Sequence, residues 1–186
     1  KTPIVVNDSR GFYTSRVVGT YLREGHLMLG EGLPPAMIEN VARMAGMPVG
    51  PLALNDEVAV DLAWKILKAT EADLGAKGID SRQKKLLQEM VEKRGRFGRK
   101  NGKGFYDYPA NGPKKLWPDL AELQPKQLDP DKIDIEELKL RLLGIQALET
   151  ARCLEEKVLT DVREADVGSI LGFGFAPFSG GTLSWI

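Results

Sequence analysis

The chain has very few of the side chains that most often form metal sites, disulfides and nucleophilic centres. It contains one histidine, His26, and one cysteine, Cys153. A lone cysteine excludes a disulfide within the chain and suits a reducing compartment. A metal site built on histidine and cysteine is excluded too, because such sites need three or four of these ligands. We therefore expect no metal ligands, and we interpret Cys153 as a small apolar residue packed beside its helix stripe.

An excess of charge of one sign is also missing. Lys and Arg number 26, Asp and Glu number 26, and the formal net charge at pH 7 is zero. Such a chain has no overall field that attracts nucleic acid or anionic lipid. No apolar run approaches the roughly 18 residues that a membrane span needs. We expect no nucleic-acid partner and no membrane span.

No signal peptide is visible, and the chain begins at Lys1 without an initiator methionine. We therefore expect it to be a fragment of a longer protein, in which targeting signals would lie elsewhere. The 42% apolar and 28% charged residues are typical of a globular domain.

What the chain does have is a repeat of itself at an offset of about 125 residues. Residues 16–19 return as 141–144, and Glu24 returns as Glu149. After a two-residue slip, residues 38–39 return as 165–166. Repeats usually mean that one helical unit needs a copy of itself to cover its apolar face. The second copy stops before any counterpart of residues 57–108, so we expect it to be truncated.

The repeat predicts how the two copies pack. The apolar stripe of the second long helix should contact the stripe of the first around an approximate two-fold axis. The residues involved are Leu143, Ala147, Ala151 and Leu154 in the second copy and Val18, Leu22 and Leu29 in the first. Because the second copy is truncated, some of its surface should stay uncovered and favour self-association.

Apolar periodicity, Asp cap signals and Gly or Pro stops predict an all-α fold. The expected helices cover residues 12–33, 34–45, 81–94, 134–158 and a short range from 161, with one or two helices between 52 and 74. The β-branched residues 2–6 predict a short strand left from an upstream domain. Five of the eleven prolines lie between 109 and 130, which indicates a linker.

These signals divide the chain into four parts. We expect the last strand and linker of an upstream nucleotide-binding domain at 1–11, a first helical unit at 12–108, a proline-rich linker at 109–132 and a partial second helical unit at 133–186.

Three features are candidates for chemistry or for structure. His26 lies on the apolar stripe of the first helix, and no orienting partner is evident, which favours a partly buried packing residue over a catalytic base. The basic loop, defined as Lys93, Arg94, Arg96, Arg99, Lys100 and Lys103, either contacts a phosphate or forms a solvated turn. Glu24 and Glu149, at equivalent positions, either make a repeated structural bond, for which the amides of the glycine-proline turns are one candidate partner, or are exposed.

Three ordered motifs resemble one enzyme family. Residues 8–16 resemble the segment that joins the nucleotide-binding and helical domains of 3-hydroxyacyl-CoA dehydrogenases. Residues 46–56 resemble that family's proline-glycine-proline turn with its following aspartate, and residues 99–108 resemble the motif that closes its first helical unit. The degenerate second copy resembles the multifunctional proteins of fatty-acid β-oxidation, which also carry enoyl-CoA hydratase.

The resemblance implies NAD-dependent oxidation of a 3-hydroxyacyl-CoA to the 3-ketoacyl-CoA. It places the catalytic histidine, its glutamate and the NAD-binding Rossmann domain upstream of Lys1, so the fragment should have no catalytic or cofactor-binding residue and no activity alone. The family usually has asparagine near the reacting end of the substrate where this chain has Ser15, which makes Ser15 the candidate substrate-binding residue. A hydroxyl offers one donor in place of the amide's two.

The same resemblance implies an acyl-CoA substrate, a thiolase subunit as a partner, and a cytoplasmic location in bacteria or a mitochondrial or peroxisomal one in eukaryotes. The alternative is a non-catalytic dimerisation or assembly module of a multienzyme complex. An upstream dinucleotide-binding fingerprint would distinguish the two hypotheses.

Overall fold

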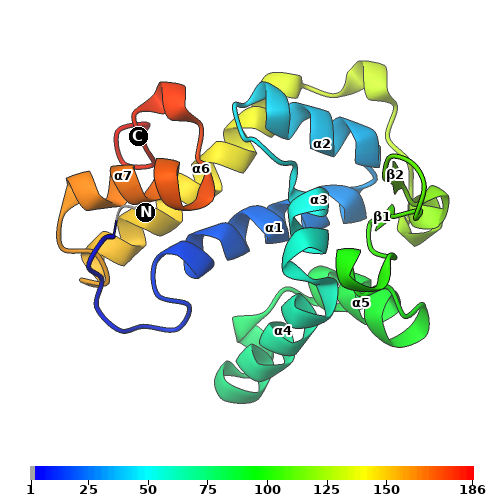
Figure 1. Cartoon of the computed structure of the whole chain (residues 1–186), viewed down its shortest axis with the longest axis horizontal. Helices are drawn as coiled ribbons and strands as arrows, with labels where there is room; N and C mark the ends of the chain where they lie inside the picture. Colours follow the sequence, from blue (N-terminus) through cyan, green and yellow to red (C-terminus); the bar gives the residue numbers. More distant parts are fainter. Residues whose placement is uncertain (1–2) are drawn as a thin grey trace. The chain divides into compact units, whose positions relative to one another are not determined.

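Helices dominate residues 3–186, the part of the chain that the computed structural model describes (Figure 1). Their bounds are α1 Thr14–Glu31, α2 Pro35–Met44, α3 Pro51–Val58, α4 Val60–Leu74, α5 Ser81–Gln88, α6 Ile135–Glu155 and α7 Val162–Phe173. Single 3-10 or π turns cover Ala76–Gly78, Glu89–Lys93, Arg99–Asn101, Pro118–Leu123, Pro130–Lys132 and Pro177–Ser179. Two short antiparallel strands, β1 Tyr106–Asp107 and β2 Lys115–Leu116, are the strands among the described residues. The predicted all-α class is confirmed.

Local signals explain where the helices begin. The Asp80 carboxylate accepts from the Arg82 amide at the start of α5, and Asp161 accepts from the Arg163 amide at the start of α7. Asp134 accepts from the amides of Glu136 and Glu137 at the start of α6. These carboxylates satisfy amide groups that have no partner within the first helical turn. The cap signals in the sequence therefore fix these three helix starts.

The chain forms two compact units, each discontinuous in sequence. The paired-helix unit contains the described part of Lys1–Glu24, together with Asn40–Gly50 and Asp134–Ile186. The loop unit contains Gly25–Glu39 and Pro51–Ile133. The first repeat contributes to both units, so these units do not coincide with the predicted division at residue 109. The division into 1–11, 12–108, 109–132 and 133–186 remains a prediction about the sequence repeats.

Two crossed ion pairs join α1 and α6 inside the paired-helix unit. Arg16 pairs with Glu149, and Arg141 Nε donates to Glu24 Oε1 over 2.7 Å. Arg16 corresponds to Arg141 in the repeat and Glu24 to Glu149, so the same contact is made twice in opposite directions. That exchange of equivalent residues is what an approximate two-fold axis produces. The predicted pairing of the two long helices is confirmed.

Of the apolar residues predicted to make this contact, only Leu154 packs against the buried cluster of this unit. Leu22, Leu29, Leu143 and Ala147 are buried but are not part of that cluster, and Ala151 is only partly buried. The buried cluster contains Val17 of α1, whereas Val18 was the predicted contact. The cluster also includes Tyr13, Cys153, Val158, Leu159 and Ala165, with Leu154 packed against it. Cys153 is fully buried and burial raises the pKa of its thiol, in agreement with its interpretation as an apolar packing residue.

Glu24 and Glu149 make a repeated structural bond, as one interpretation expected, but their partners are arginines and not turn amides. The alternative of surface exposure is wrong, because both side chains are 12% exposed. The amide-binding role belongs to another equivalent pair, Glu39 and Asp166. In the loop unit, Glu39 accepts from the amides of Leu52 and Ala53 at 2.9 and 3.4 Å. In the paired-helix unit, Asp166 accepts from the amides of Leu183 and Ser184 at 2.8 and 3.3 Å.

A side-chain hydroxyl donates a further hydrogen bond to each of these two carboxylates. The Tyr106 hydroxyl donates to Glu39 over 2.8 Å, and the Ser184 hydroxyl donates to Asp166 over 2.6 Å. The two repeats therefore fix the segment that follows their turn by the same chemistry, and they take the hydroxyl from different places in the sequence.

Residues 3–9 run as an extended segment that belongs to no strand. The Asn7 amide donates to the Val158 carbonyl over 2.9 Å, and the Asn7 side chain donates to the Lys157 carbonyl over 2.7 Å. The predicted strand at 2–6 is wrong for the described residues 3–6, because a strand needs a partner in a sheet and this segment bonds to the end of α6 instead. Thr2 lies outside the described residues.

The proline-rich residues 109–132 are packed within the loop unit. Trp117 and Leu120 are buried. The Gln124 side chain donates to the carbonyls of Leu29 and Leu33 at 3.0 and 2.7 Å. A segment with such bonds is an ordered connection, although its composition is typical of a linker.

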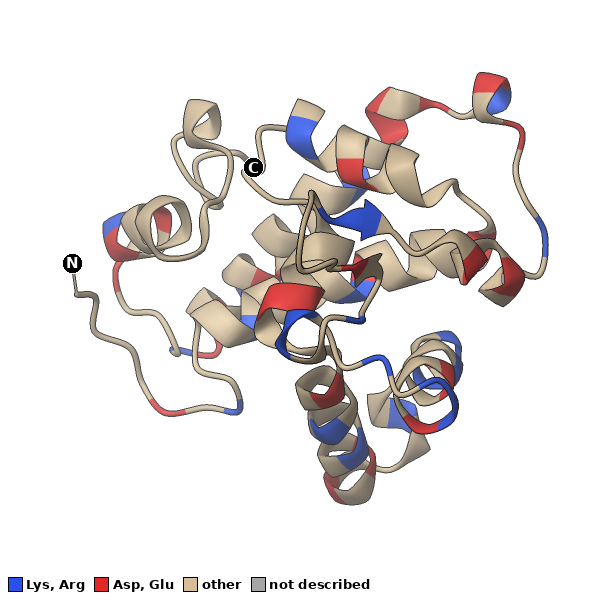
Figure 2. Ribbon diagram, turned by 45° about the vertical axis from the view of Figure 1, so that its right-hand side comes forward, with Lys and Arg blue, Asp and Glu red and all other residues tan. Residues whose placement is uncertain are grey.

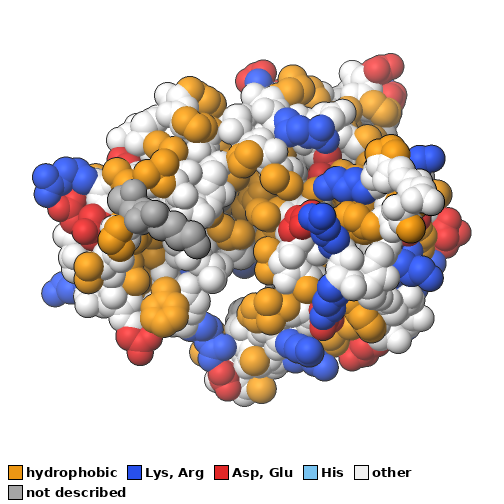
Figure 3. All heavy atoms as spheres, in the orientation of Figure 1, with side chains coloured by type: hydrophobic (Ala, Val, Ile, Leu, Met, Phe, Trp, Pro, Cys, Tyr) orange, Lys and Arg blue, Asp and Glu red, His pale blue; other side chains and the backbone are white. Residues whose placement is uncertain are grey.

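Exposed hydrophobic side chains occur on both units. Leu171, Phe178 and Ile186 in the second repeat are each about 70% exposed. Leu62 and Ile66 are exposed on α4 of the loop unit. Figure 3 shows such side chains among charged ones on one face. Self-association through the uncovered surface of the second repeat remains a prediction.

Ala59, between α3 and α4, has a backbone conformation that favours glycine, with φ 95° and ψ 121°. We expect Ala59→Gly to raise the free energy of unfolding by about 1 kcal/mol, because relief of strain exceeds the entropy that glycine adds to the unfolded chain. Urea denaturation measures this. Ala72→Gly at an exposed position within α4 is the control, and it should cost about 1 kcal/mol. An equal loss of unfolding free energy in Ala59→Gly and Ala72→Gly would contradict the prediction.

Candidate functional site

Ser15 is the second residue of α1, and its side chain is exposed. The next residue, Arg16, fixes this end of the helix. Its guanidinium pairs with Glu149 and donates to both carboxylate oxygens of Glu156 at 2.6 and 3.0 Å. The Ser15 hydroxyl is therefore presented to solvent on a rigid helix start, where it can bond to a ligand.

His26 belongs to the loop unit and has partners that the sequence did not reveal. Its Nε2 lies 2.8 Å from Asn55 Oδ1, and Gln83 Nε2 donates to its Nδ1 over 3.1 Å. Because Nδ1 accepts, Nε2 carries the proton and donates to Asn55. The ring stacks on Phe105 with centroids 5.4 Å apart, and its exposed fraction is 2%. His26 is fully buried, more so than predicted, and it joins three segments of the unit.

Asp56 is the second buried polar centre of the loop unit. Its carboxylate accepts from the amides of Phe105 and Tyr106, both at 2.8 Å, and from the Tyr108 hydroxyl at 3.0 Å. A Cβ atom added to Gly104 would lie 1.9 Å from Asp56 Oδ1, so only glycine permits this approach. Burial raises the pKa of Asp56 to about 6. With its lone pairs bonded to donors, Asp56 fixes the loop rather than acting as a base.

Burial lowers the pKa of His26 to about 4 from 6.5. The neutral imidazole therefore stabilises the fold fully above pH 6.5, and this contribution should be lost as pH falls through 4. The loss should reach about 3 kcal/mol. Urea denaturation from pH 7 to pH 4 would measure the difference in stability between wild type and His26→Gln.

The comparison of wild type with His26→Gln is needed because protonation of Asp56 changes the stability of the fold in the opposite direction. Its raised pKa makes the folded state bind a proton more tightly, so its contribution grows as pH falls from 6 to 4. Because Asp56 contributes equally to both proteins, its contribution cancels in the difference in unfolding free energy between wild type and His26→Gln. A difference that does not change with pH would contradict the prediction for His26.

Most cations of the basic loop are exposed and pair with acidic side chains, which agrees with a solvated turn and argues against contact with a phosphate. Lys93 bonds to Glu89, Arg94 to Glu89 and Glu122, Arg99 to Glu57 and Lys100 to Asp61. Figure 2 shows acidic and basic residues interspersed along the helices, α4 among them. These cations connect neighbouring segments, so most of their charge is already neutralised.

Arg96 is the buried member of the loop. Its guanidinium donates to the carbonyls of Gly104 and Tyr106 at 2.6 and 3.2 Å and to Asp107 at 2.5 Å. It also lies 4.1 Å from the ring centroid of Trp117. Planar donors and a cation–π contact suit arginine and not lysine. Arg96 therefore organises the closing motif from inside.

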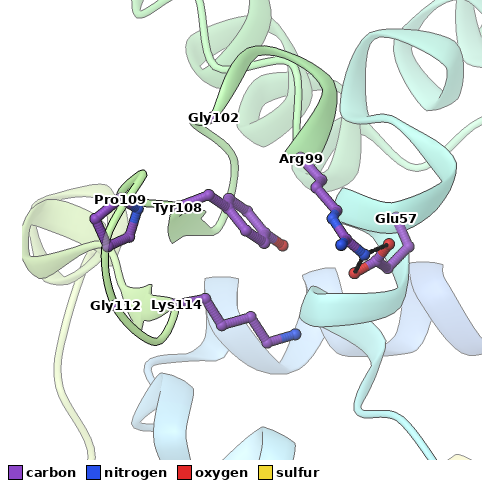
Figure 4. A pocket seen from close by; sticks show the side chains of 7 residues that line it. All are labelled: Glu57, Arg99, Gly102, Tyr108, Pro109, Gly112 and Lys114. Carbon is purple, nitrogen blue, oxygen red and sulfur yellow. Dashed lines mark hydrogen bonds and ion pairs between the residues drawn. The ribbon is translucent and has the colours of Figure 1, made fainter.

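An open pocket of about 530 Å³ lies in the loop unit (Figure 4). Glu57, Arg99, Gly102, Tyr108, Pro109, Gly112 and Lys114 line it. Tyr108 and Lys114 point into the space, and Arg99 bonds to both oxygens of Glu57 at 3.0 and 2.8 Å (Figure 4). The Lys114 ammonium lies 4.7 Å from the ring centroid of Tyr106. Both cations have partners, so the pocket carries no concentrated charge.

The described residues contain no group of three or more His, Cys, Asp or Glu side chains that could bind a metal ion. Over the same residues, no helix combines the length and apolar character needed to cross a membrane. The candidates from sequence fall into both units: Ser15 in the paired-helix unit, and His26 with the basic loop in the loop unit. Asn55 and Asp56 lie within the 46–56 motif, and their bonding roles become visible only in the structure.

Comparisons with known proteins agree with this geometry. A family model described as 3-hydroxyacyl-CoA dehydrogenase, C-terminal domain, matches residues 11–108. The fatty acid oxidation complex subunit alpha of Vibrio cholerae serotype O1 is 37% identical over 189 residues, which cover 100% of this chain and 26% of that protein. The namesake from Vibrio vulnificus is similar to the same extent. The chain thus spans about a quarter of the length of these relatives.

Two solved structures share the fold. One is 3-hydroxybutyryl-CoA dehydrogenase from Escherichia coli K12, with a TM-score of 0.71 and 18% identity over 100% of this chain and 54% of that one. The other is the dehydrogenase part of multifunctional enzyme 1 from C. elegans, with a TM-score of 0.68 and 23% identity over 94% of this chain and 39% of that one.

Proposed function

The chain belongs to the family of 3-hydroxyacyl-CoA dehydrogenase C-terminal domains, and we propose that it is the helical part of a multifunctional enzyme of fatty-acid β-oxidation. The longer protein would oxidise a 3-hydroxyacyl-CoA to the 3-ketoacyl-CoA with NAD. The observation that carries this proposal is the family match over 11–108. That range contains the start of α3, whose amides bond to Glu39, and the closing loop, whose amides bond to Asp56.

NAD itself does not fit the residues of this chain. A dinucleotide site of the Rossmann type needs a strand, a glycine-rich turn and a helix that presents its amides to the pyrophosphate. The described residues contain only the antiparallel pair β1 and β2, each of two residues. We assign no hydride-transfer or proton-transfer step to this chain, and we place the catalytic histidine, its glutamate and the NAD site in an upstream domain.

The relatives supply the rest of the proposal. Because the chain matches 26% of a complex subunit from a bacterium, the longer protein would also carry enoyl-CoA hydratase and associate with a thiolase subunit in the bacterial cytoplasm. The two-fold ion pairs of the paired-helix unit do not favour the alternative of an assembly module. Since both pairs close within one chain, they support an internal copy in place of a second subunit.

The first test separates the fragment from the longer protein. Purified 1–186 should neither oxidise 3-hydroxyacyl-CoA nor bind NAD measurably, whereas the longer protein should do both. NADH absorbance during turnover and calorimetric titration with NAD measure these two properties. Saturable binding of NAD to the fragment at micromolar concentration would contradict the placement of the cofactor site.

Ser15 is the proposed substrate-binding residue. Its exposed hydroxyl on a fixed helix start supports this role. In the longer enzyme, Ser15→Ala should lower kcat/KM by about two- to twelve-fold, the effect of one lost neutral hydrogen bond. The melting temperature should hardly change. Steady-state assays of Ser15→Ala and Ser15→Asn, with Thr14→Ala as a control at the neighbouring exposed hydroxyl, measure the effect.

The Asn variant restores the amide that is usual in the family and should keep the activity. If Ser15→Ala and Thr14→Ala both left kcat/KM unchanged, Ser15 would be only a residue of the helix start.

A further inference from the structure

Phe12 has an unusual backbone conformation for a bulky residue. Its φ of 50° lies in the left-handed region, which L-residues with large side chains rarely adopt. The same side chain is 55% exposed. Within the described residues, neither burial nor backbone preference accounts for phenylalanine here, because glycine or asparagine would adopt this conformation more readily.

The surroundings of Phe12 hold the strained turn without using its ring. The Phe12 amide donates to the Ser9 carbonyl over 3.0 Å, and the Ser9 hydroxyl donates to the Phe12 carbonyl over 3.3 Å. The Arg16 amide donates to the Gly11 carbonyl over 3.2 Å. Strained residues persist where neighbouring contacts over-determine them, and they occur preferentially at ligand-binding sites.

The two neighbouring aromatic side chains of this turn lie in different environments, with Tyr13 buried and Phe12 exposed. Tyr13 is 1% exposed, and its hydroxyl donates to the Ala165 carbonyl over 2.8 Å. The turn conformation is thus explained by the burial of Tyr13. The ring at position 12 needs a separate reason, since the turn itself would form equally well without it.

We propose that Phe12 is a specificity-determining residue whose ring contacts the acyl chain of the substrate beside Ser15. Phe12 lies three positions before Ser15 in the chain, so their Cα atoms lie within about 11 Å of each other. The acyl chain is an apolar part of a 3-hydroxyacyl-CoA and begins next to the reacting carbon. An exposed ring at that distance gains contact area when a long chain covers it and gains little from a short one. This inference rests on the proposed function.

The test compares substrates of different length in the longer enzyme. Phe12→Asn and Phe12→Gly remove the ring and relieve the backbone strain. We expect kcat/KM for a 12-carbon 3-hydroxyacyl-CoA to fall about tenfold in both variants, and kcat/KM for the 4-carbon substrate to change less than about twofold. The melting temperature should stay equal or rise. Phe12→Leu, which keeps an apolar side chain, should retain most of the preference for the long substrate.

Other outcomes would overturn the inference. An equal change for both substrates, or no change, would show that the ring does not contact the acyl chain. A lower melting temperature with an unchanged ratio between the substrates would mean that the ring packs against another part of the longer chain. If wild type failed to oxidise any 3-hydroxyacyl-CoA, the proposed function would fail, and this inference would fail with it.

Discussion

Replacing Asp56 with alanine is expected to destabilise the loop unit by about 3–5 kcal/mol. The substitution leaves the buried amides of Phe105 and Tyr106 and the hydroxyl of Tyr108 without their acceptor. It also opens a space beside Gly104, whose backbone packs on the carboxylate. Urea denaturation followed by tryptophan fluorescence suits this measurement, since Trp64 and Trp117 lie in the same unit.

Two variants test the mechanism behind that loss. Tyr108→Phe removes one donor and leaves the amide bonds intact, so it should cost about 1 kcal/mol. Asp56→Asn retains one acceptor oxygen but turns an NH2 group towards a donor, so its cost should lie between the other two. If Asp56→Ala cost no more than Tyr108→Phe, the closing loop would not depend on the Asp56 carboxylate.

The second large effect concerns the crossed ion pairs. Arg141→Glu places a carboxylate against Glu24, whose side chain is 12% exposed, and should lower the free energy of unfolding by about 2–3 kcal/mol. Adding Glu24→Arg to Arg141→Glu recreates an ion pair of reversed polarity and should recover at least half of the loss. Thermal and urea denaturation of the single and double variants measure the coupling between the two positions.

The control position is Glu136 on the same helix, which pairs with Lys139 and whose side chain is 80% exposed. Glu136→Lys reverses one charge there and should have little effect, because exposed ion pairs contribute little. Additive losses in the double variant, with no recovery, would show that Arg141 and Glu24 do not depend on each other.

The sequence by itself determined the helices and their starts. Asp80, Asp134 and Asp161 act on amides two or three residues away, so the caps could be predicted from a short window. The apolar stripes predicted that α1 and α6 would pair, because a stripe of that length must be covered. The repeat showed which residues are equivalent. Three ordered motifs, at 8–16, 46–56 and 99–108, supplied the family resemblance that the match over 11–108 bears out.

Only the tertiary structure decided which equivalent residues meet and what they bond to. Equivalence alone did not show that Arg16 would face Glu149, nor that Glu39 and Asp166 would accept the turn amides. Asp56 bonds to amides about 50 residues further along the chain, and His26 bonds to Gln83 57 residues away. Local sequence patterns predict which face of a helix is buried. The hydrogen-bond partner of a buried polar side chain depends on which distant segments pack against it. The strained, exposed Phe12 is a different case, because bonds within residues 9–16 fix its backbone.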